Sequence, residues 1–301
     1  MIRYHLVTYL ALAAAVVFWG FSFIATKIAL QSLTPFCLIF IRFFLASLFF
    51  GFMLFGRSAP PVSQDTFLKL GLLALFQPGL YFFFETYGLK YSSATKTSLI
   101  IATIPIVVLL LSSMFLRERL RPINIIGIIC SLIGVSLLVF GGSESGSLGS
   151  LMSGDLLIAG AVLSAAVYII FARHLGQTIS AMQITGLQII YGTAIFLPFF
   201  LWDMNHVDWL NLAPRVLFSI VWLTVFATIG AFSCYNFALT RVAAARASVF
   251  INAIPLVTAF GAWLLLGERL TPLQMAGGAV VIAAVYLANY RSKPRPYRAS
   301  T

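Results

Sequence analysis

Charged residues are scarce in this chain of 301 residues, and acidic residues are the scarcest. Lys, Arg, Asp and Glu together make up 9% of the sequence, and Asp and Glu contribute only 8 residues, whereas 61% of all residues are hydrophobic. A water-soluble domain of this length does not have enough polar groups here to cover its surface. The composition therefore excludes a soluble protein and predicts one that is embedded in lipid.

Cysteine and histidine are also rare, with three residues of each. The cysteines all fall within apolar stretches, at spacings that fit neither a zinc site nor a disulfide framework. His5, His174 and His206 lie near the ends of apolar stretches and far apart, so neither a metal site nor a catalytic triad is indicated. We therefore expect no metal, no cofactor and no enzymatic activity. A membrane-embedded enzyme remains an alternative class of function.

Ten apolar stretches are present, each long enough to cross a bilayer as a helix. A helix in lipid satisfies its backbone hydrogen bonds internally, and the alternating pattern of a transmembrane β-barrel is missing. The predicted fold class is an all-α integral membrane protein with ten transmembrane helices. They span residues 7–30, 34–56, 66–89, 93–116, 122–141, 153–174, 180–202, 214–239, 243–266 and 272–290.

The chain contains the same segment twice, 150 positions apart. Phe84–Phe140 and Cys234–Tyr290 align without a gap and are identical at 15 of 57 positions, including Pro105 and Pro255. Five spans fit in each half, and an odd number of spans places the second half in the opposite orientation. Inverted repeats of this kind are typical of secondary transporters, in which two related halves alternately expose a site to each side.

The repeat divides the chain into four parts. Residues 1–141 form the first five-helix repeat, residues 142–152 a linker rich in Gly and Ser, and residues 153–291 the second, inverted repeat. Residues 292–301 form a basic tail, which we expect to lie on anionic lipid in the cytoplasm. The net charge of +11 therefore indicates membrane topology and no nucleic-acid partner.

Lys and Arg are distributed unequally between the two ends of the spans. One side would carry thirteen: Arg3, Arg57, Lys69, Arg117, Arg119, Arg121, Arg173, Arg241, Arg246, Arg291, Lys293, Arg295 and Arg298. The other side would carry five: Lys27, Lys90, Lys96, Arg215 and Arg269. Basic residues concentrate on the cytoplasmic side of membrane proteins, so we expect both termini in the cytoplasm.

Short motifs occur in the same order in this chain and in a known family. They are Phe18-Trp19-Gly20, Ile41-Arg42-Phe43, Tyr91-Ser92-Ser93-Ala94, Glu118-Arg119-Leu120 and Gly267-Glu268-Arg269-Leu270. With them, nearly the whole chain resembles the EamA-type members of the drug/metabolite transporter superfamily. The resemblance implies ten helices in the inner (plasma) membrane and transport of a small polar metabolite, commonly the export of an amino acid or a related compound. A nucleoside, a sugar and a drug-like cation remain alternative solutes.

Two ionisable residues lie well inside predicted spans, and they are the first candidates for binding a solute. Arg42 and Glu85 fall at overlapping depths in the second and third spans. A charge within the bilayer costs roughly 2.5–3.5 kcal/mol on insertion scales, so it usually has a partner or a function. One interpretation is a buried Arg42–Glu85 pair that fixes helix register. The other is contact with the solute, with Glu85 also able to take up a proton.

Further candidates come from repeat-equivalent positions and from polar or aromatic residues within spans. Lys96 and Arg246 are equivalent cations at the starts of the fourth and ninth spans, where they either attract an anionic group or only mark helix ends. The remaining candidates for solute binding are Trp19, Tyr81, Thr103, Tyr168, Tyr235, Asn236 and Asn252. Aromatic walls with a few polar groups suit a zwitterionic or amphipathic metabolite.

Proline and small residues predict how the helices move and pack. Pro105 and Pro255 lie inside the fourth and ninth spans and are candidate hinges for rocking of one half against the other, because proline kinks a helix. Gly127, Gly134 and Gly277 allow close helix approach in the fifth and tenth spans. These two spans are therefore expected to pack away from the cavity or to support a homodimer.

Overall fold

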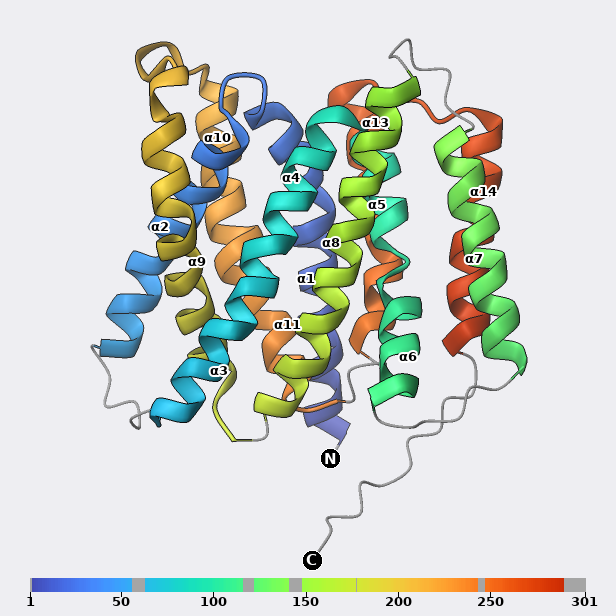
Figure 1. The fold of residues 1–301 in the computed structure, drawn as a ribbon, viewed down its shortest axis with the longest axis horizontal. Coiled ribbons are helices and arrows are strands. Elements are labelled where there is room, and N and C mark those ends of the chain that lie inside the picture. Colours follow the sequence, from blue (N-terminus) through green and yellow to red (C-terminus); the bar gives the residue numbers. More distant parts are fainter. Residues whose placement is uncertain are drawn as a thin grey trace, which may run out of the picture.

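Every regular element that the structure describes is a helix (Figure 1). The computed structural model describes residues 2–55, 63–115, 122–140, 148–176, 178–242 and 247–289. Seven helical spans in these ranges are long and apolar enough to cross a membrane. Three shorter apolar helices, Ile125–Gly134, Phe250–Leu266 and Pro272–Ala284, bring the total to the ten spans predicted from the sequence.

The helices of the first half form five passes between the two ends of the bundle. They are α1 (Ile2–Ala29), α2 (Pro35–Phe55), the path α3 (Gln64–Ala74), η1 (Leu75–Leu80) and α4 (Tyr81–Tyr91), the path α5 (Ala94–Ile101) and α6 (Ile104–Phe115), and α7 (Pro122–Phe140). We call the end at which α1 begins and α14 finishes the terminal end, and the opposite end the far end (Figure 1).

The second half repeats this order. It consists of α8 (Leu148–Leu175), α9 (Ala181–Asp203), the path α10 (Pro214–Trp222), η4 (Leu223–Gly230) and α11 (Ala231–Leu239), the path η5 (Val249–Ala253) and α13 (Ile254–Leu266), and α14 (Pro272–Asn289). Two short 3₁₀ turns, η2 (Met204–His206) and η3 (Trp209–Asn211), connect α9 to α10.

The third span of each half is not a continuous α-helix, although the sequence predicts one. It is interrupted by the π-helical segments η1 and η4, which occupy equivalent positions of the repeat. In η1, Pro78 has no backbone N–H to donate, and Gln77 leaves the helical region with φ −145° and ψ 116°. Such interruptions release backbone and side-chain groups in the middle of a helix and are frequent at functional sites.

The fourth and ninth spans are also interrupted, in each case just before the proline that both repeats share. α5 ends at Ile101 and α6 begins at Ile104, and the 3₁₀ segment η5 passes into α13 at Ile254. Pro105 and Pro255 therefore lie in the first turn of the following helix, where a missing N–H costs nothing. The expectation of a proline inside one kinked helix is corrected to a break that precedes it.

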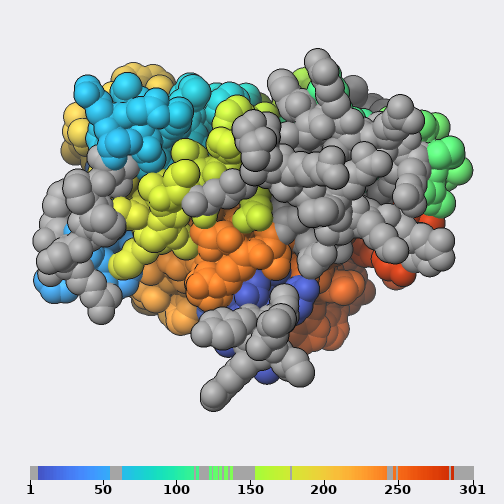
Figure 2. All heavy atoms as spheres, turned by 90° about the horizontal axis from the view of Figure 1, so that it is seen from below, coloured from blue at the N-terminus to red at the C-terminus, as the bar shows by residue number. Residues whose placement is uncertain are grey.

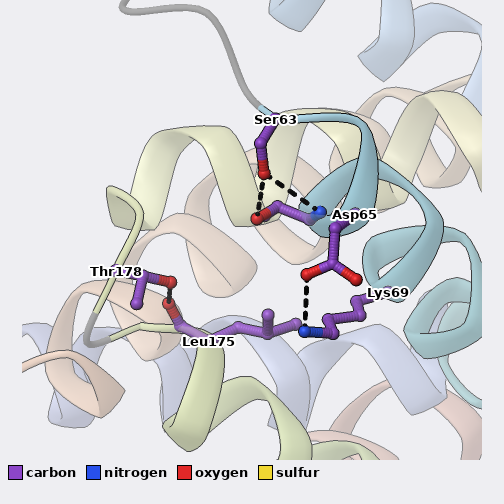
Figure 3. Close-up of polar contacts among 6 residues, drawn as sticks. Ser63, Asp65, Lys69, Leu175 and Thr178 are labelled. Carbon is purple, nitrogen blue, oxygen red and sulfur yellow. Dashed lines mark hydrogen bonds and ion pairs between the residues drawn. The ribbon is translucent and has the colours of Figure 1, made fainter.

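Local side-chain contacts fix several helix ends. Ser63 caps α3 by accepting a hydrogen bond from the Thr66 backbone N–H, and Asp65 in the same turn pairs with Lys69 at 2.6 Å (Figure 3). Thr178 closes the end of α8 by donating to the Leu175 carbonyl oxygen at 3.0 Å (Figure 3). Caps of this type satisfy backbone groups that the helix itself leaves unpaired.

The two halves are interleaved, because the most extensive helix contacts join one half to the other. These contacts are α7 with α14, α2 with α9, α4 with α8, and α1 with both α13 and α11. Seen from the terminal end, atoms of α3 (light blue) adjoin those of α8 (yellow-green), which in turn adjoin α11 (orange) (Figure 2). Two separate lobes, one for each half, are therefore not present in the described residues.

The fifth and tenth spans pack on each other at one edge of the bundle (Figure 1). Gly134 of α7 lies so close to α14 that an added Cβ would be 2.8 Å from Val281 Cγ2 and 3.0 Å from the Gly277 carbonyl oxygen. The small residues of these spans thus serve a contact within one chain, away from the centre of the bundle. A homodimer stays a prediction, and this pattern does not require one.

Candidate functional site

A cavity lies at the centre of the bundle, between the two halves. Its polar and amphipathic lining residues are Trp19, Ser22, Arg42, Gln77, Tyr81, Glu85, Tyr168 and Tyr235. Its apolar lining residues are Phe23, Phe82, Ile101, Ile104, Ala165, Ile169, Phe232, Ile251 and Ile254. The space outside protein atoms is about 570 Å³, including any part open to the surroundings.

Six of the candidate residues from the sequence are brought together on this wall. They are Trp19, Arg42, Tyr81, Glu85, Tyr168 and Tyr235. The first, third, fourth, sixth, eighth and ninth spans supply every lining residue except Arg42, which comes from the second span. Equivalent spans from both halves therefore surround the cavity.

Arg42 is held on the cavity wall by a contact that crosses between the halves. Its Nε donates a hydrogen bond to Thr228 Oγ1 at 3.0 Å, and its guanidinium carbon lies 4.6 Å from the centre of the Phe82 ring. Thr228 belongs to η4, and its hydroxyl donates to the Leu223 carbonyl oxygen at 2.8 Å. The π-helical segment thus presents the hydroxyl that orients Arg42, whose two remaining nitrogens carry donors for an anionic group.

Glu85 lies on the same wall but does not form an ion pair with Arg42. Among the described side chains, no carboxylate oxygen comes within 4.0 Å of the Arg42 nitrogens, and Glu85 Oε2 accepts a hydrogen bond from Thr86 Oγ1 at 3.0 Å. Arg42 and Glu85 are therefore both buried, but they do not form a direct ion pair. The cavity wall instead presents two opposite charges that are separated from each other.

Tyr168 is fixed from behind by a buried polar network in the second half. Its hydroxyl lies 2.7 Å from Asn236 Oδ1 and 2.8 Å from the Gln188 side-chain oxygen, and Asn236 Nδ2 donates to Thr185 Oγ1 at 2.9 Å. A phenol has only one hydrogen to donate, so the Tyr168 hydroxyl donates to one of these two oxygens at a time. Asn236 thus lies behind the cavity and positions Tyr168.

Tyr235 differs from Tyr168 because its hydroxyl is unused. The hydroxyl oxygen is buried and has no hydrogen-bond partner in the described part of the chain. Its ring packs on Trp19, with ring centres 5.1 Å apart, and Trp19 also meets Phe232 edge-on at 5.5 Å. A buried polar atom without a partner is unfavourable, so this hydroxyl is available to a bound solute.

Thr103 and Asn252 are not among the residues that line the cavity. The Thr103 hydroxyl donates to the Ile100 carbonyl oxygen of its own helix at 2.7 Å. The Asn252 side-chain oxygen is buried without a hydrogen-bond partner among the described residues. Arg246 lies outside the described residues.

Lys96, which the sequence predicts either to attract an anionic group or to mark a helix end, is paired with a carboxylate of the protein itself. Its Nζ lies 2.7 Å from Asp155 Oδ2, and only 4% and 7% of the two side chains are exposed. Ser92 Oγ donates to the other Asp155 oxygen at 3.4 Å. Buried ion pairs of this kind are costly to break, by about 3–5 kcal/mol when one partner is removed.

Sequence reasoning missed Gln77, which lines the cavity, Thr228, which contacts Arg42, and Asp155, which pairs with Lys96. Gln77 and Thr228 were missed because the third span of each half was predicted to be a regular helix. Pro78, inside the third span of the first half, could have indicated an interruption. Asp155 falls at the start of a predicted span, where an acid is usually attributed to the lipid headgroup region. Its proximity to Lys96 arises from the packing of α5 against α8, which no local pattern reports.

Comparison with known proteins identifies the family. Residues 6–140 and 152–290 each match the EamA-like transporter family. The chain belongs to this family. It is therefore a multi-pass membrane transporter and not an enzyme, as members of the family are transporters of the plasma membrane.

Relatives of this EamA protein cover it almost from end to end. An uncharacterized transporter of Archaeoglobus fulgidus is 30% identical over 280 residues, which is 93% of this chain and 97% of the relative. The uncharacterized transporter YetK of Bacillus subtilis is 26% identical and covers 100% of this chain and 92% of its own length. A crystal structure described only as that of a protein shares the fold, with a TM-score of 0.67, 18% identity and coverage of 93% and 96%.

The described residues of this EamA protein hold no group of three or more His, Cys, Asp and Glu side chains that could bind a metal ion. Its polar cavity residues are instead arranged as isolated hydrogen-bonding and charged groups among aromatic rings. Such an arrangement recognises and orients a molecule, because each polar group contacts a different part of it.

Proposed function

We propose that this EamA transporter carries a small zwitterionic metabolite, most readily an amino acid or a related compound, out of the cell by alternating access. The observation that supports this choice is the separation of Arg42 and Glu85 on one cavity wall. Both side chains are buried, at 3% exposed each, and they do not neutralise each other by direct contact. A solute with both a carboxylate and an ammonium group satisfies both charges at once.

The chemistry of the wall fits the two ends of such a molecule. Arginine binds carboxylates through parallel N–H donors, and it keeps its positive charge because its guanidinium group does not readily lose a proton. Glu85 accepts hydrogen bonds from an ammonium group. Tyr235 offers a hydroxyl without a partner, and the rings of Trp19, Phe232 and Tyr81 contact the rest of the solute.

The orientation in the membrane follows from the basic residues. Lys69, Arg173 and Arg241 belong to the terminal end of the bundle, whereas the five basic residues predicted for the other side belong to spans that end or begin at the far end. We propose that the terminal end, with both termini, faces the cytoplasm. Export as the net direction is taken from the family resemblance.

We propose that the elements that move come from both halves and do not follow the boundary between the repeats. Rocking of one whole half against the other would separate α7 from α14 and α2 from α9 along their length, which are among the largest contacts of the molecule. The interruptions before Pro105 and Pro255 lie at the depth of the cavity, since Ile101, Ile104 and Ile254 line it. We propose these two interruptions as the hinges, in place of movement between intact halves.

Counterflow in liposomes tests the proposal. Purified protein is reconstituted into vesicles loaded with amino acids, nucleosides, sugars or quaternary ammonium compounds, and uptake of the matching radiolabelled solute is followed. Saturable exchange of amino acids, with the solute recovered unchanged, is the expected result. Exchange of only a nucleoside, a sugar or a cation would replace the zwitterion in this proposal, and chemical conversion of the solute would contradict transport.

A further inference from the structure

A buried ion pair joins the two halves at the far end of the bundle. Lys96 lies in the first turn of α5, in the first half, and Asp155 lies near the start of α8, in the second half. Their Nζ–Oδ2 distance is 2.7 Å, and Ser92, in the turn between α4 and α5, donates to the same carboxylate at 3.4 Å. The pair is thus the centre of a polar contact between halves.

A second carboxylate connects the halves at the same end. Glu268, in the second half, accepts hydrogen bonds from the backbone N–H groups of Ala94 at 2.9 Å and Thr95 at 3.1 Å, and from the Thr95 hydroxyl at 2.9 Å. Gly267 ends α13 with φ 67°, a conformation that suits glycine, and so directs the chain toward α5. An anion at this position satisfies the free N–H groups of the α5 N-terminus.

The backbones of the two halves also touch beside the ion pair. An added Cβ on Gly88 of α4 would lie 2.6 Å from Ile158 Cγ1 and 2.9 Å from the Gly154 carbonyl oxygen of α8. Gly154 is the neighbour of Asp155 in the sequence. Because Gly88 and Gly154 have no side chains, α4 and α8 approach closely enough for Ser92 and Lys96 to reach the Asp155 carboxylate.

These contacts lie directly between the cavity and the far end. Phe23, Glu85 and Ile101 line the cavity. Ser92, which comes after Glu85 in the sequence, and Lys96, which comes before Ile101, lie within two helical turns of these residues in the direction of the far end. Ser92 and Lys96 are each 3% exposed, so protein atoms alone enclose both side chains, without any contribution from lipid.

The position that corresponds to Asp155 at the terminal end is not acidic, and the equivalent of Lys96, Arg246, lies outside the described residues. In the alignment that matches Lys27 with Arg173, Asp155 corresponds to Tyr9. Tyr9 stacks on Phe250 with ring centres 5.8 Å apart. An aromatic contact thus occupies the position that corresponds to this carboxylate.

We infer that the Lys96–Asp155 ion pair is the contact that closes the far end of the transport pathway, and that it separates whenever the cavity opens to that side. The inference rests on the proposed alternating-access function. Two side chains from different halves cannot remain at 2.7 Å while a solute-sized passage forms between α5 and α8. The strength of this contact then sets how often the far end opens.

Accessibility of a cysteine in the cavity tests this inference without any solute. Ser22 lines the cavity and is replaced by cysteine after Cys37, Cys130 and Cys234 have been changed to alanine. A membrane-impermeant thiol reagent is applied to each side of sealed vesicles. The Asp155→Asn substitution is expected to raise the labelling rate from the far-end side on the order of tenfold or more, because a broken buried pair no longer favours closure.

Two further variants accompany this measurement. Asp65→Asn removes the same charge from the exposed Asp65–Lys69 pair, whose side chains are 73% and 59% exposed (Figure 3), and is expected to leave labelling unchanged. The exchanged pair Lys96→Asp/Asp155→Lys restores opposite charges and is expected to return labelling toward the original rate. Unchanged labelling in a folded Asp155→Asn protein overturns the inference.

A cross-link decides the matter if Asp155→Asn does not fold. Lys96→Cys and Asp155→Cys are combined in the cysteine-free protein and joined by oxidation in the membrane. Counterflow is expected to stop in the cross-linked protein and to return on reduction, whereas continued counterflow overturns the inference. Absence of counterflow in the unmodified protein would contradict the proposed function alone, because cysteine labelling still reports on closure.

Discussion

Lys27 and Arg173 make the same contact at opposite ends of the bundle. Lys27 Nζ donates to the Leu89 carbonyl oxygen at 3.0 Å, and Arg173 Nη1 donates to the Leu239 carbonyl oxygen at 2.7 Å. Leu89 and Leu239 are identical residues 150 positions apart. The inverted repeat is thus present in individual contacts: in each half, the end of the first span is attached to the end of the third.

Replacing Arg42 by lysine is expected to reduce counterflow by roughly 10- to 100-fold. The lysine keeps the positive charge but loses the planar arrangement of donors and the hydrogen bond from Nε to Thr228, and hydrogen bonds to charged groups contribute about 1.5–3 kcal/mol. Initial rates of amino-acid counterflow provide the measurement. Arg215→Lys, at an exposed position near the far end, is the matched control, and equal rates for both variants would contradict a role for Arg42 in binding.

Replacing Glu85 by glutamine is expected to weaken the exchange of zwitterions and to flatten its dependence on pH. The substitution keeps the shape of the side chain but removes both its charge and its ability to take up a proton. Counterflow is measured across a series of pH values, with Glu85→Asp as the variant that keeps the charge. A pH profile in the glutamine variant that matches the unmodified protein would exclude Glu85 as a site of proton coupling.

Removing the hydroxyl groups of Tyr235 and Tyr168 should have different effects. Tyr235→Phe removes a hydroxyl without a protein partner, so we expect weaker solute binding and an unchanged melting temperature. Tyr168→Phe leaves Asn236 and Gln188 without their shared partner, and it should lower stability by about 1–3 kcal/mol. Thermal unfolding in detergent and the half-saturation of counterflow separate the two. Equal loss of stability in both variants would contradict a free Tyr235 hydroxyl.

An alanine at Gly134 is expected to destabilise the protein. Its Cβ would lie 2.8 Å from Val281 Cγ2 and 2.9 Å from the Val281 nitrogen, and overpacking of this kind costs about 1–3 kcal/mol. Gly51→Ala is the matched control, because nothing lies within 4 Å of its Cβ and alanine favours a helix. Melting temperatures provide the measurement. A Gly134→Ala protein as stable as the control would mean that α7 and α14 separate readily.

The proposed orientation predicts which cysteines a reagent outside the cell can reach. Gln64, at the start of α3, and Leu210, between α9 and α10, are both exposed and lie at opposite ends of the bundle. In a cysteine-free protein, Leu210→Cys should react with an impermeant thiol reagent on intact cells, and Gln64→Cys only after the cells are opened. The reverse pattern would place both termini outside.

The ten spans were predictable because each is a local feature of the sequence. An apolar run of sufficient length is helical in lipid whatever surrounds it, and predicted ends such as 34–56 for Pro35–Phe55 differ from the structure by one residue. The interruptions at η1 and η4 were not predictable in the same way. They depend on packing, as between Pro78 and Gly192, where an added Cβ would lie 2.3 Å from the proline ring.

The candidate site was predictable in its residue types but not in its pairings. Depth along a span was enough to select Arg42, Glu85 and Tyr235, which line the cavity. Depth does not reveal which side chain faces which neighbour. Lys96 was therefore expected to attract an anionic group or to mark a helix end, and its partner Asp155 is revealed only by the packing of α5 on α8.

The interleaved halves have a consequence for the order in which the protein is made. Lys96 enters the membrane with the fourth span, whereas its partner Asp155 is synthesised only with the sixth span. The partner of Arg42, Thr228, is synthesised later still, with the eighth span. A fragment that ends after the fifth span would hold both cations in lipid without these partners. The repeat is thus a unit of sequence but not a unit of folding, and the nascent chain reaches its stable arrangement only after most of the second half has been inserted.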